Sequence, residues 1–217
     1  MKTKTILFSV LLMSGIILFS CGEKEEKKAE KVKKEEKKIV ENNSETEYIL
    51  LNSILDSLLK LETPPAPSPA ELKKMKNGDK TVMPVFINSL LFSINEESFY
   101  YENIKYFNTD DESKKLIDIL VSGESNDRYL ALDKIKLSEK YQLMPFGTKE
   151  ELKKNEGEFP LFAYVKISRI AFNKEKNKSC FFFVLTYKGK GNGYLVFTEK
   201  TGENWGIKNA VGVWKSE

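Results

Sequence analysis

The feature that most constrains the fold is the run SCFFFVLTY at 179–187, which is apolar on both of its faces. Side chains of an extended strand alternate between two faces. The alternation separates two apolar sets, Phe181, Phe183, Leu185 and Tyr187 on one face and Cys180, Phe182 and Val184 on the other. A strand of this kind lies inside a sheet and is covered on both sides. We expect helices to form one cover and either a second sheet or a partner protein to form the other.

Further segments predict strands beside this one, because β-branched and aromatic residues dominate them. They are FAYVKISRIAF at 162–172, GYLVFTEK at 193–200 and the tryptophan-containing end of the chain at 205–214. Turn residues separate the strands at 173–178, 188–193 and 201–204. The sequence therefore predicts an α+β fold, in which N-terminal helices pack on a C-terminal antiparallel β-meander at 160–215 within a globular domain at 70–217.

An amphipathic helix is predicted ahead of this domain, over residues 45–62. Ser44 and Glu47 have the spacing of a capping box at its start. Its apolar stripe consists of Leu51, Ile54, Leu55 and Leu58. A stripe at this spacing indicates a packing face rather than a cofactor groove.

Between this helix and the meander the pattern is mixed. Residues 63–69 are proline-rich and predict a stiff, extended connector. Ser68 and Thr148 each begin a further capping box, the first for a short helix ending at Asn77–Gly78 and the second for a brief helix to about Lys154. The apolar part of segment 80–107 could form a buried strand or a short helix, and we favour a strand for the aromatic run that ends at Phe107.

A helix is also predicted from Asp110 or Asp111 to about Val121, closed by Ser122–Gly123. Its inward residues are Leu116, Ile117 and Leu120. The acidic trio Asp110, Asp111 and Glu112 is explained by the positive end of the helix dipole. Calcium loops alternate their oxygen ligands with spacers and contain a glycine, which this trio lacks, so we expect no metal site there.

Histidine is absent from the whole chain, which removes Ser-His-Asp and Cys-His catalysis and His-ligated zinc. The chain has two cysteines, Cys21 and Cys180, so a disulfide framework and a cysteine-rich metal site are excluded. We expect no cofactor. Without Lys2 and Lys4, the 35 basic residues become 33 against 32 acidic ones, so a basic surface for nucleic acid is not expected.

The N-terminus has the features of a secretion signal over residues 1–20. Lys2 and Lys4 form a basic region, and residues 6–19 are apolar or small. This run has 14 residues, whereas a membrane-spanning helix needs about 20. The run is therefore too short for a retained membrane anchor.

Leu18-Phe19-Ser20-Cys21 resembles the lipobox of bacterial lipoproteins, with Phe19 departing from the small residue usual at that position. The resemblance implies cleavage between Ser20 and Cys21, diacylglycerol on the Cys21 thiol, and acylation of the new amine. Two or three acyl chains hold a protein stably at a membrane, whereas one holds it only marginally. The alternative is an ordinary signal followed by an incidental cysteine, and we favour lipidation.

Residues 21–44 predict a lipidated, charged tether, because 23–38 are almost entirely Lys and Glu and cannot bury apolar area. Residues 22–47 would reach roughly 28 Å as a coil or roughly 39 Å as a helix. Lys24-Glu25-Glu26 resembles the short signal that sends some Bacteroidetes lipoproteins to the cell surface. We expect an outer-membrane protein that faces either the cell surface or the periplasm.

The C-terminal 50 or so residues resemble small uncharacterised Bacteroidetes lipoproteins. The shared pattern comprises Ser168, Arg169, Ile170 and Phe172 in one strand, Gly191 and Gly193 in a hairpin, and Trp205 in a glycine-rich turn. The resemblance implies a related fold and carries no activity.

Three other features were weighed as chemical sites. The run KGKGNG at 188–193 lies between two strands rather than before a helix, so we favour a hairpin turn over a phosphate loop. Arg128 and Arg169 are the only arginines, and for Arg169 we favour a structural pair over a ligand contact. Cys180 is expected to be a small buried hydrophobe.

These features favour a monomeric, non-catalytic binding module, anchored to membrane lipid through Cys21 and meeting a protein or glycan partner at the cell envelope. The alternative is a hydrolase of envelope glycans that uses two carboxylates and needs no histidine. Such an enzyme requires two acids roughly 5–9.5 Å apart in a cleft.

Overall fold

The computed structural model divides the chain into two compact units, Met1–Glu45 and Thr46–Glu217. The residues it describes are 45–66, 68–69, 82–95, 100–104, 107, 109–123, 128–146, 159 and 161–216. The predicted signal, tether and capping residue Ser44 lie outside these residues, as do most of the short helix before Gly78 and the one after Thr148.

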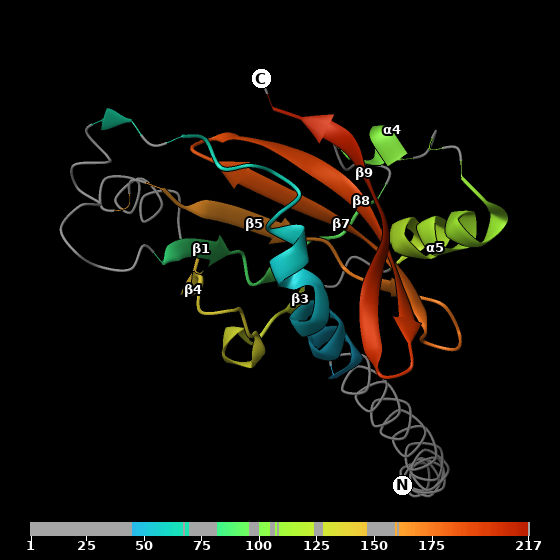
Figure 1. Cartoon of the computed structure of the whole chain (residues 1–217). Coiled ribbons are helices and arrows are strands. Elements are labelled where there is room, and N and C mark those ends of the chain that lie inside the picture. Colours follow the sequence, from blue (N-terminus) through green and yellow to red (C-terminus); the bar gives the residue numbers. More distant parts are fainter. Residues whose placement is uncertain are drawn as a thin grey trace, which may run out of the picture. The chain divides into compact units, whose positions relative to one another are not determined.

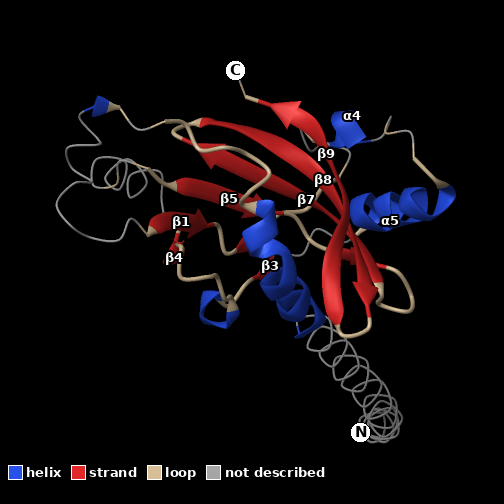
Figure 2. Ribbon diagram, in the orientation of Figure 1, coloured by secondary structure: helices blue, strands red, loops and turns tan. Residues whose placement is uncertain are grey.

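In the larger sheet the strands lie in the order β4-β1-β5-β7-β8-β9, and β6 pairs with β7 (Figures 1 and 2). The strands are β1 (Met83–Ile87), β4 (Tyr141–Pro145), β5 (Ala163–Ile167), β6 (Ala171–Phe172), β7 (Lys178–Tyr187), β8 (Lys190–Thr201) and β9 (Asn204–Lys215). From β5 to β9 the paired neighbours are antiparallel. The α+β class and the C-terminal meander are confirmed.

The other end of the sheet is parallel, because β1 pairs in parallel with both β4 and β5. Parallel neighbours need a long crossover connection. Here the crossover from β1 to β4 contains a small sheet of β2 (Leu90–Leu91) and β3 (Arg128–Tyr129). It also contains the helices α4 (Tyr101–Ile104) and α5 (Asp111–Ser122) and the turn η1 (Leu132–Lys134). A short buried run such as 83–87 has no periodicity that separates strand from helix, so the sequence left this part open.

The glycine-rich segment 188–193 forms a hairpin. Lys188 and Gly189 both have positive φ, 50° and 78°, which is the pattern of a two-residue type I′ turn. The strand β8 therefore begins at Lys190, earlier than expected. Glycine is needed at 191 for a different reason, since a Cβ there would lie 2.0 Å from the backbone oxygen of Leu185.

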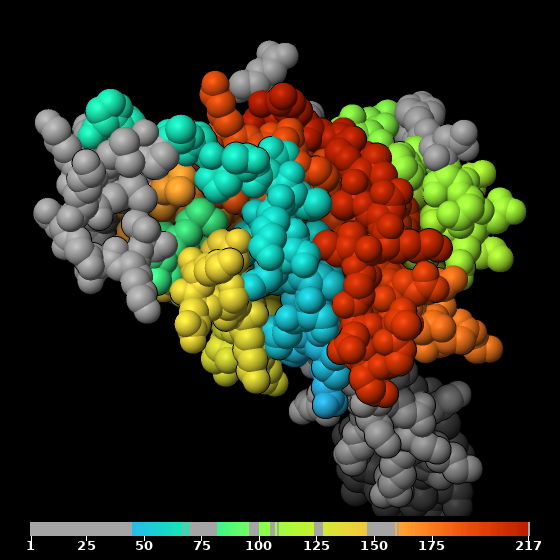
Figure 3. All heavy atoms as spheres, viewed as in Figure 1, coloured from blue at the N-terminus to red at the C-terminus, as the bar shows by residue number. Residues whose placement is uncertain are grey.

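One face of the sheet is covered by the helix at residues 45–58, which Figure 3 shows in blue and cyan between the C-terminal strands and the yellow segment. Its predicted stripe is fully buried, together with the adjoining leucines Leu50 and Leu59. They pack on β1, β5, β7 and β8, where Phe181, Phe183, Leu185 and Val196 are buried in the same cluster. Polar side chains of the helix also bond to the 131–138 segment, for example Asn52 to the backbone of Lys134 and Lys136.

The opposite face is covered by α4 (Tyr101–Ile104) and α5 (Asp111–Ser122). Cys180, Phe182 and Val184 of β7 are buried here with the inward face of α5, so the predicted alternation along β7 is correct. The expectation of a second sheet or a partner as the second cover is wrong, because helices cover both faces of this strand.

The strand favoured for the run ending at Phe107 is also wrong, since residues 101–104 form α4. Strand propensity measures how well a side chain packs on a sheet, and packing decides here. Ile104 is buried in the core between the sheet and the α4–α5 layer, which we call the second core. The centre of the Tyr100 ring lies 4.6 Å from the centre of the Phe182 ring.

The helix predicted from Asp110 is confirmed as α5, and its inward residues are Leu116, Ile117 and Leu120. Asp110 caps it by accepting bonds from the backbone N–H groups of Glu112 and Ser113 at 3.1 and 2.9 Å. These bonds, led by that from Ser113, hold the pKa of Asp110 below its usual value.

Candidate functional site: two arginines around a buried glutamate

The residues predicted to receive lipid or to direct export, Ser20, Cys21 and 24–26, lie outside the described part of the chain. Within the described part, no helix is both long and apolar enough to cross a membrane. The most unusual polar arrangement among the described residues lies elsewhere, near the turn between β5 and β6.

Glu47 is the centre of this arrangement. It lies in the first turn of the 45–58 helix, and its side chain is only 3% exposed. Arg128, in the short strand β3, donates a hydrogen bond from Nη1 to Glu47 Oε1 at 2.8 Å. When Glu47 is ionised, both partners are charged, and such bonds are stronger than neutral ones. Glu47 thus pairs with Arg128, a partner 81 residues away that the capping-box reading of the sequence missed.

Burial raises the pKa of Glu47 to about 7, although the charges of Arg128 and Arg169 both lower it. The carboxylate has lost most of its contact with water, and desolvation penalises the ionised form. Among the described residues, Glu47 is the one acidic side chain that is buried. Perturbed acids of this kind gather at functional sites, although structural pairs produce them too.

Arg169 follows β5, and hydrogen bonds hold its backbone in place. Its N–H donates to the carbonyl of Phe92 at 2.9 Å. The hydroxyl of the buried Ser168 donates to the Arg169 carbonyl at 2.8 Å and accepts from the N–H of Phe182, also at 2.8 Å. Arg169 is therefore positioned by the central strand β7 and by the segment after β2.

The guanidinium of Arg169 packs against Gly123, at the end of α5. A Cβ on Gly123 would lie 3.2 Å from Arg169 Nη2 and 3.4 Å from its Cζ. The last turn of a helix carries a partial negative charge, which favours a cation at this place. Arg169 thus lies between the end of α5 and Glu47, whose pKa its charge lowers.

Arg169 Nη1 has no hydrogen-bond partner. It is the only buried side-chain nitrogen or oxygen without one among the described residues. A buried polar atom left unpaired costs about 1–3 kcal/mol, and more when it is charged. The structural pair favoured for Arg169 from the sequence is thus incomplete, whereas Arg128 does form such a pair.

Among the described residues, Arg128 bonds to Glu47 and the charge of Arg169 also acts on it, so we call Glu47, Arg128 and Arg169 the arginine site. Arginine presents its donors in a planar fork that matches carboxylate and phosphate groups, which lysine does not. A signal was present in the sequence, because only two of the 35 basic residues are arginine and the charges of both act on Glu47. Nothing in the sequence indicated that they would act on the same carboxyl group.

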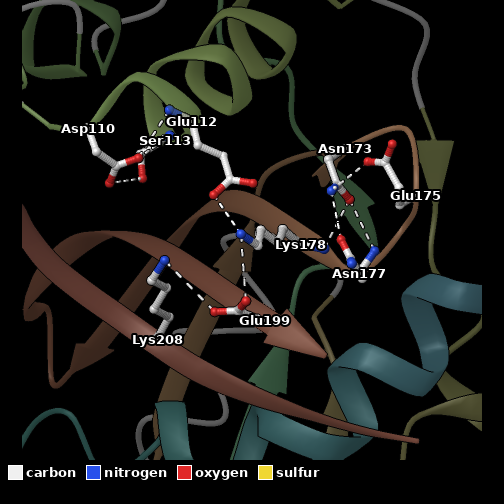
Figure 4. A network of polar contacts seen from close by, with 9 residues as sticks. All are labelled: Asp110, Glu112, Ser113, Asn173, Glu175, Asn177, Lys178, Glu199 and Lys208. Atoms are coloured by element: carbon white, nitrogen blue, oxygen red, sulfur yellow. Dashed lines mark hydrogen bonds and ion pairs between the residues drawn. The ribbon is translucent and has the colours of Figure 1, made fainter. Parts of the chain in front are cut away.

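A second polar network lies on the surface and holds α5 to the sheet (Figure 4). Lys178 of β7 contacts Glu112 at 2.6 Å and Glu199 at 3.6 Å, and Lys208 contacts Glu199 at 3.8 Å. The bond to Glu112 raises the pKa of Lys178. The acidic trio therefore caps and pins a helix, and no three potential metal ligands gather anywhere in the described residues.

A third cluster fixes the end of the 45–58 helix. Glu62 accepts hydrogen bonds from the hydroxyl of Tyr194 and the side-chain amide of Asn192. The hydroxyl of Tyr187 donates to the carbonyl of Leu59 at 3.1 Å. Burial is the main cause that raises the pKa of both tyrosines to about 12. All these groups have partners, so the cluster is explained by packing.

Cys180 is fully buried in β7, as expected, and burial raises the pKa of its thiol. A thiol in this state is a poor nucleophile, because the thiolate is the reactive form.

No family model, curated protein or solved structure matches this chain.

Proposed function

We propose that this chain is an exported lipoprotein of the cell envelope, held at the outer membrane through lipid on Cys21, and that its folded domain is a non-catalytic binding module. The observation that carries the anchor is the leader, where a basic start and an apolar run of 14 residues lead into a cysteine. The run is too short to span a bilayer, for which about 20 residues are needed.

The arginine site supports the binding role. It offers an unpaired, charge-bearing donor on a well-ordered part of the fold, where hydrogen bonds fix the Arg169 backbone. A glycan hydrolase needs a second carboxylate near the first. Among the described residues, the neighbours whose charges act on the buried Glu47 are arginines instead.

The anchor is tested by growing cells with a labelled fatty acid and isolating the protein. We expect label on the wild type and loss of both label and membrane association in Cys21→Ser. Cys180→Ala is the matched control, because it removes the only other cysteine, which is buried. A native product with a free Cys21 thiol, or with residues 1–20 still attached in its mass spectrum, would refute the proposal.

The side of the membrane is tested by treating intact cells with protease. We propose that Lys24-Glu25-Glu26 directs the domain to the cell surface, so that protease removes it. Replacing these three residues by alanine should then protect the domain without affecting lipidation. Protection of the wild-type protein would instead place the domain in the periplasm.

A further inference from the structure

The arginine site is chemically incomplete in the free protein. Glu47 bonds to Arg128, while the buried Arg169 Nη1 has no acceptor. Positive charge that is buried without a partner is costly, and an anion that supplies acceptor oxygens removes the cost.

We propose that Arg169 binds one oxyanion group, the carboxylate or phosphate of a ligand, beside Glu47. This inference rests on the proposed binding function and names the ligand chemistry of the same site. The oxyanion accepts from Arg169 Nη1, which is buried within a residue that is partly exposed, so its entry involves a local movement of the side chain.

Three features of the surroundings suit an anion rather than a cation or a neutral group. The unpaired donor belongs to arginine, whose charged fork matches two oxygens at once. The Arg169 backbone is fixed by bonds to Phe92 and Ser168, so little order is lost on binding. Gly123 leaves room beside the guanidinium that a side chain would reduce.

Glu47 acts as an internal competitor in this arrangement. Above pH 7, where it is ionised, its carboxylate contacts Arg128 and repels an incoming oxyanion, and its low exposure keeps that repulsion poorly screened. Replacing it by glutamine keeps the shape of the side chain and removes the charge. We therefore expect Glu47→Gln to bind the oxyanion about tenfold more tightly than the wild type.

The test uses the full chain as cells produce it, purified in detergent and labelled with ¹⁵N-arginine. Because the chain has only two arginines, its spectrum contains two side-chain signals, from Arg128 and Arg169. Inorganic phosphate and acetate are titrated separately at constant ionic strength. We expect a saturable shift of the Arg169 signal with at least one of them, and the arm that responds identifies the preferred oxyanion.

Two substitutions locate the effect. Arg169→Met should weaken binding of the same oxyanion at least about tenfold, since one charge-assisted bond is lost. Lys174→Met is the control, because it removes one positive charge from an exposed turn and should leave binding unchanged. If Arg169→Met fails to fold, the titration of wild type against Glu47→Gln still decides the question.

Absence of a saturable shift with both phosphate and acetate would overturn the inference, and so would undiminished binding by Arg169→Met. Neither result touches the lipid anchor, which is tested through Cys21. Conversely, a protein that binds oxyanion but carries no lipid would refute the anchor and leave the site standing.

Discussion

Replacing Glu47 by glutamine should change how the stability of the protein depends on pH. Burial raises the pKa of Glu47 from the ordinary 4.5 to about 7 in the folded protein. An acid with a raised pKa binds its proton more tightly when folded, so its contribution to stability is complete below pH 4.5 and is lost as the pH rises through 7. Glutamine does not titrate, so the variant keeps a constant contribution at this position.

The size of the effect follows from the two pKa values. Each pKa unit between the folded and unfolded states corresponds to about 1.4 kcal/mol, so the change from 4.5 to about 7 corresponds to about 3 kcal/mol. The free energy of unfolding of the wild type, relative to Glu47→Gln, should therefore fall by about 3 kcal/mol between pH 4.5 and pH 8. The comparison of two proteins removes the contributions of all other titrating groups.

Urea unfolding of the full chain in detergent, followed by tryptophan fluorescence at a series of pH values, measures this difference. Trp205 is buried and reports loss of the fold. Glu203→Gln is the control, since its carboxylate is 96% exposed, and its stability curve should run parallel to that of the wild type. A Glu47→Gln curve that also stays parallel to the wild type, or a difference of opposite sign, would refute the burial argument.

Four further substitutions test the fold by the same unfolding assay. Leu55→Ala should lower the free energy of unfolding by about 2–5 kcal/mol, because the side chain is fully buried. Ile49→Ala, on the exposed face of the same helix, should lower it by less than about 0.5 kcal/mol. Equal losses would contradict the packing of this helix on the sheet. Gly193→Ala should cost about 1–3 kcal/mol, because the new Cβ would lie 2.5 Å from the ring of Phe182, and an unchanged midpoint would show that the ring moves freely. Ser168→Ala should cost about 1–3 kcal/mol, because it leaves the buried N–H of Phe182 without its acceptor; a neutral effect would mean that this bond adds nothing.

Much of the meander could be predicted because its signals are local. Alternation along 179–187 assigned the apolar side chains of β7 to the correct faces. The turn segments predicted at 173–178, 188–193 and 201–204 contain the observed hairpin turns. Helix α5 was equally readable, since Asp110 is a strong cap and the apolar spacing after it is regular.

The remaining fold depends on contacts between distant segments. The strand β1 pairs with β4 and β5, which begin 58 and 80 residues after it, and no local pattern encodes a parallel pairing. The short helix α4 forms where Tyr100 and Ile104 reach the second core, against a local sequence that favours a strand. Tertiary packing overrides propensity in segments this short.

The arginine site shows the same limit most clearly, because each covering layer contributes to it. Glu47 belongs to the helix on one face of the sheet, and Gly123 ends α5 on the other face. Arg169 lies between them at the turn after β5, where Ser168 bonds to the central strand β7. The site can therefore form only after both helical layers have packed on the sheet. A ligand that binds Arg169 would stabilise both layers at once, by an amount set by its affinity and concentration, and the oxyanion that shifts the Arg169 signal should accordingly raise the unfolding midpoint of the whole domain.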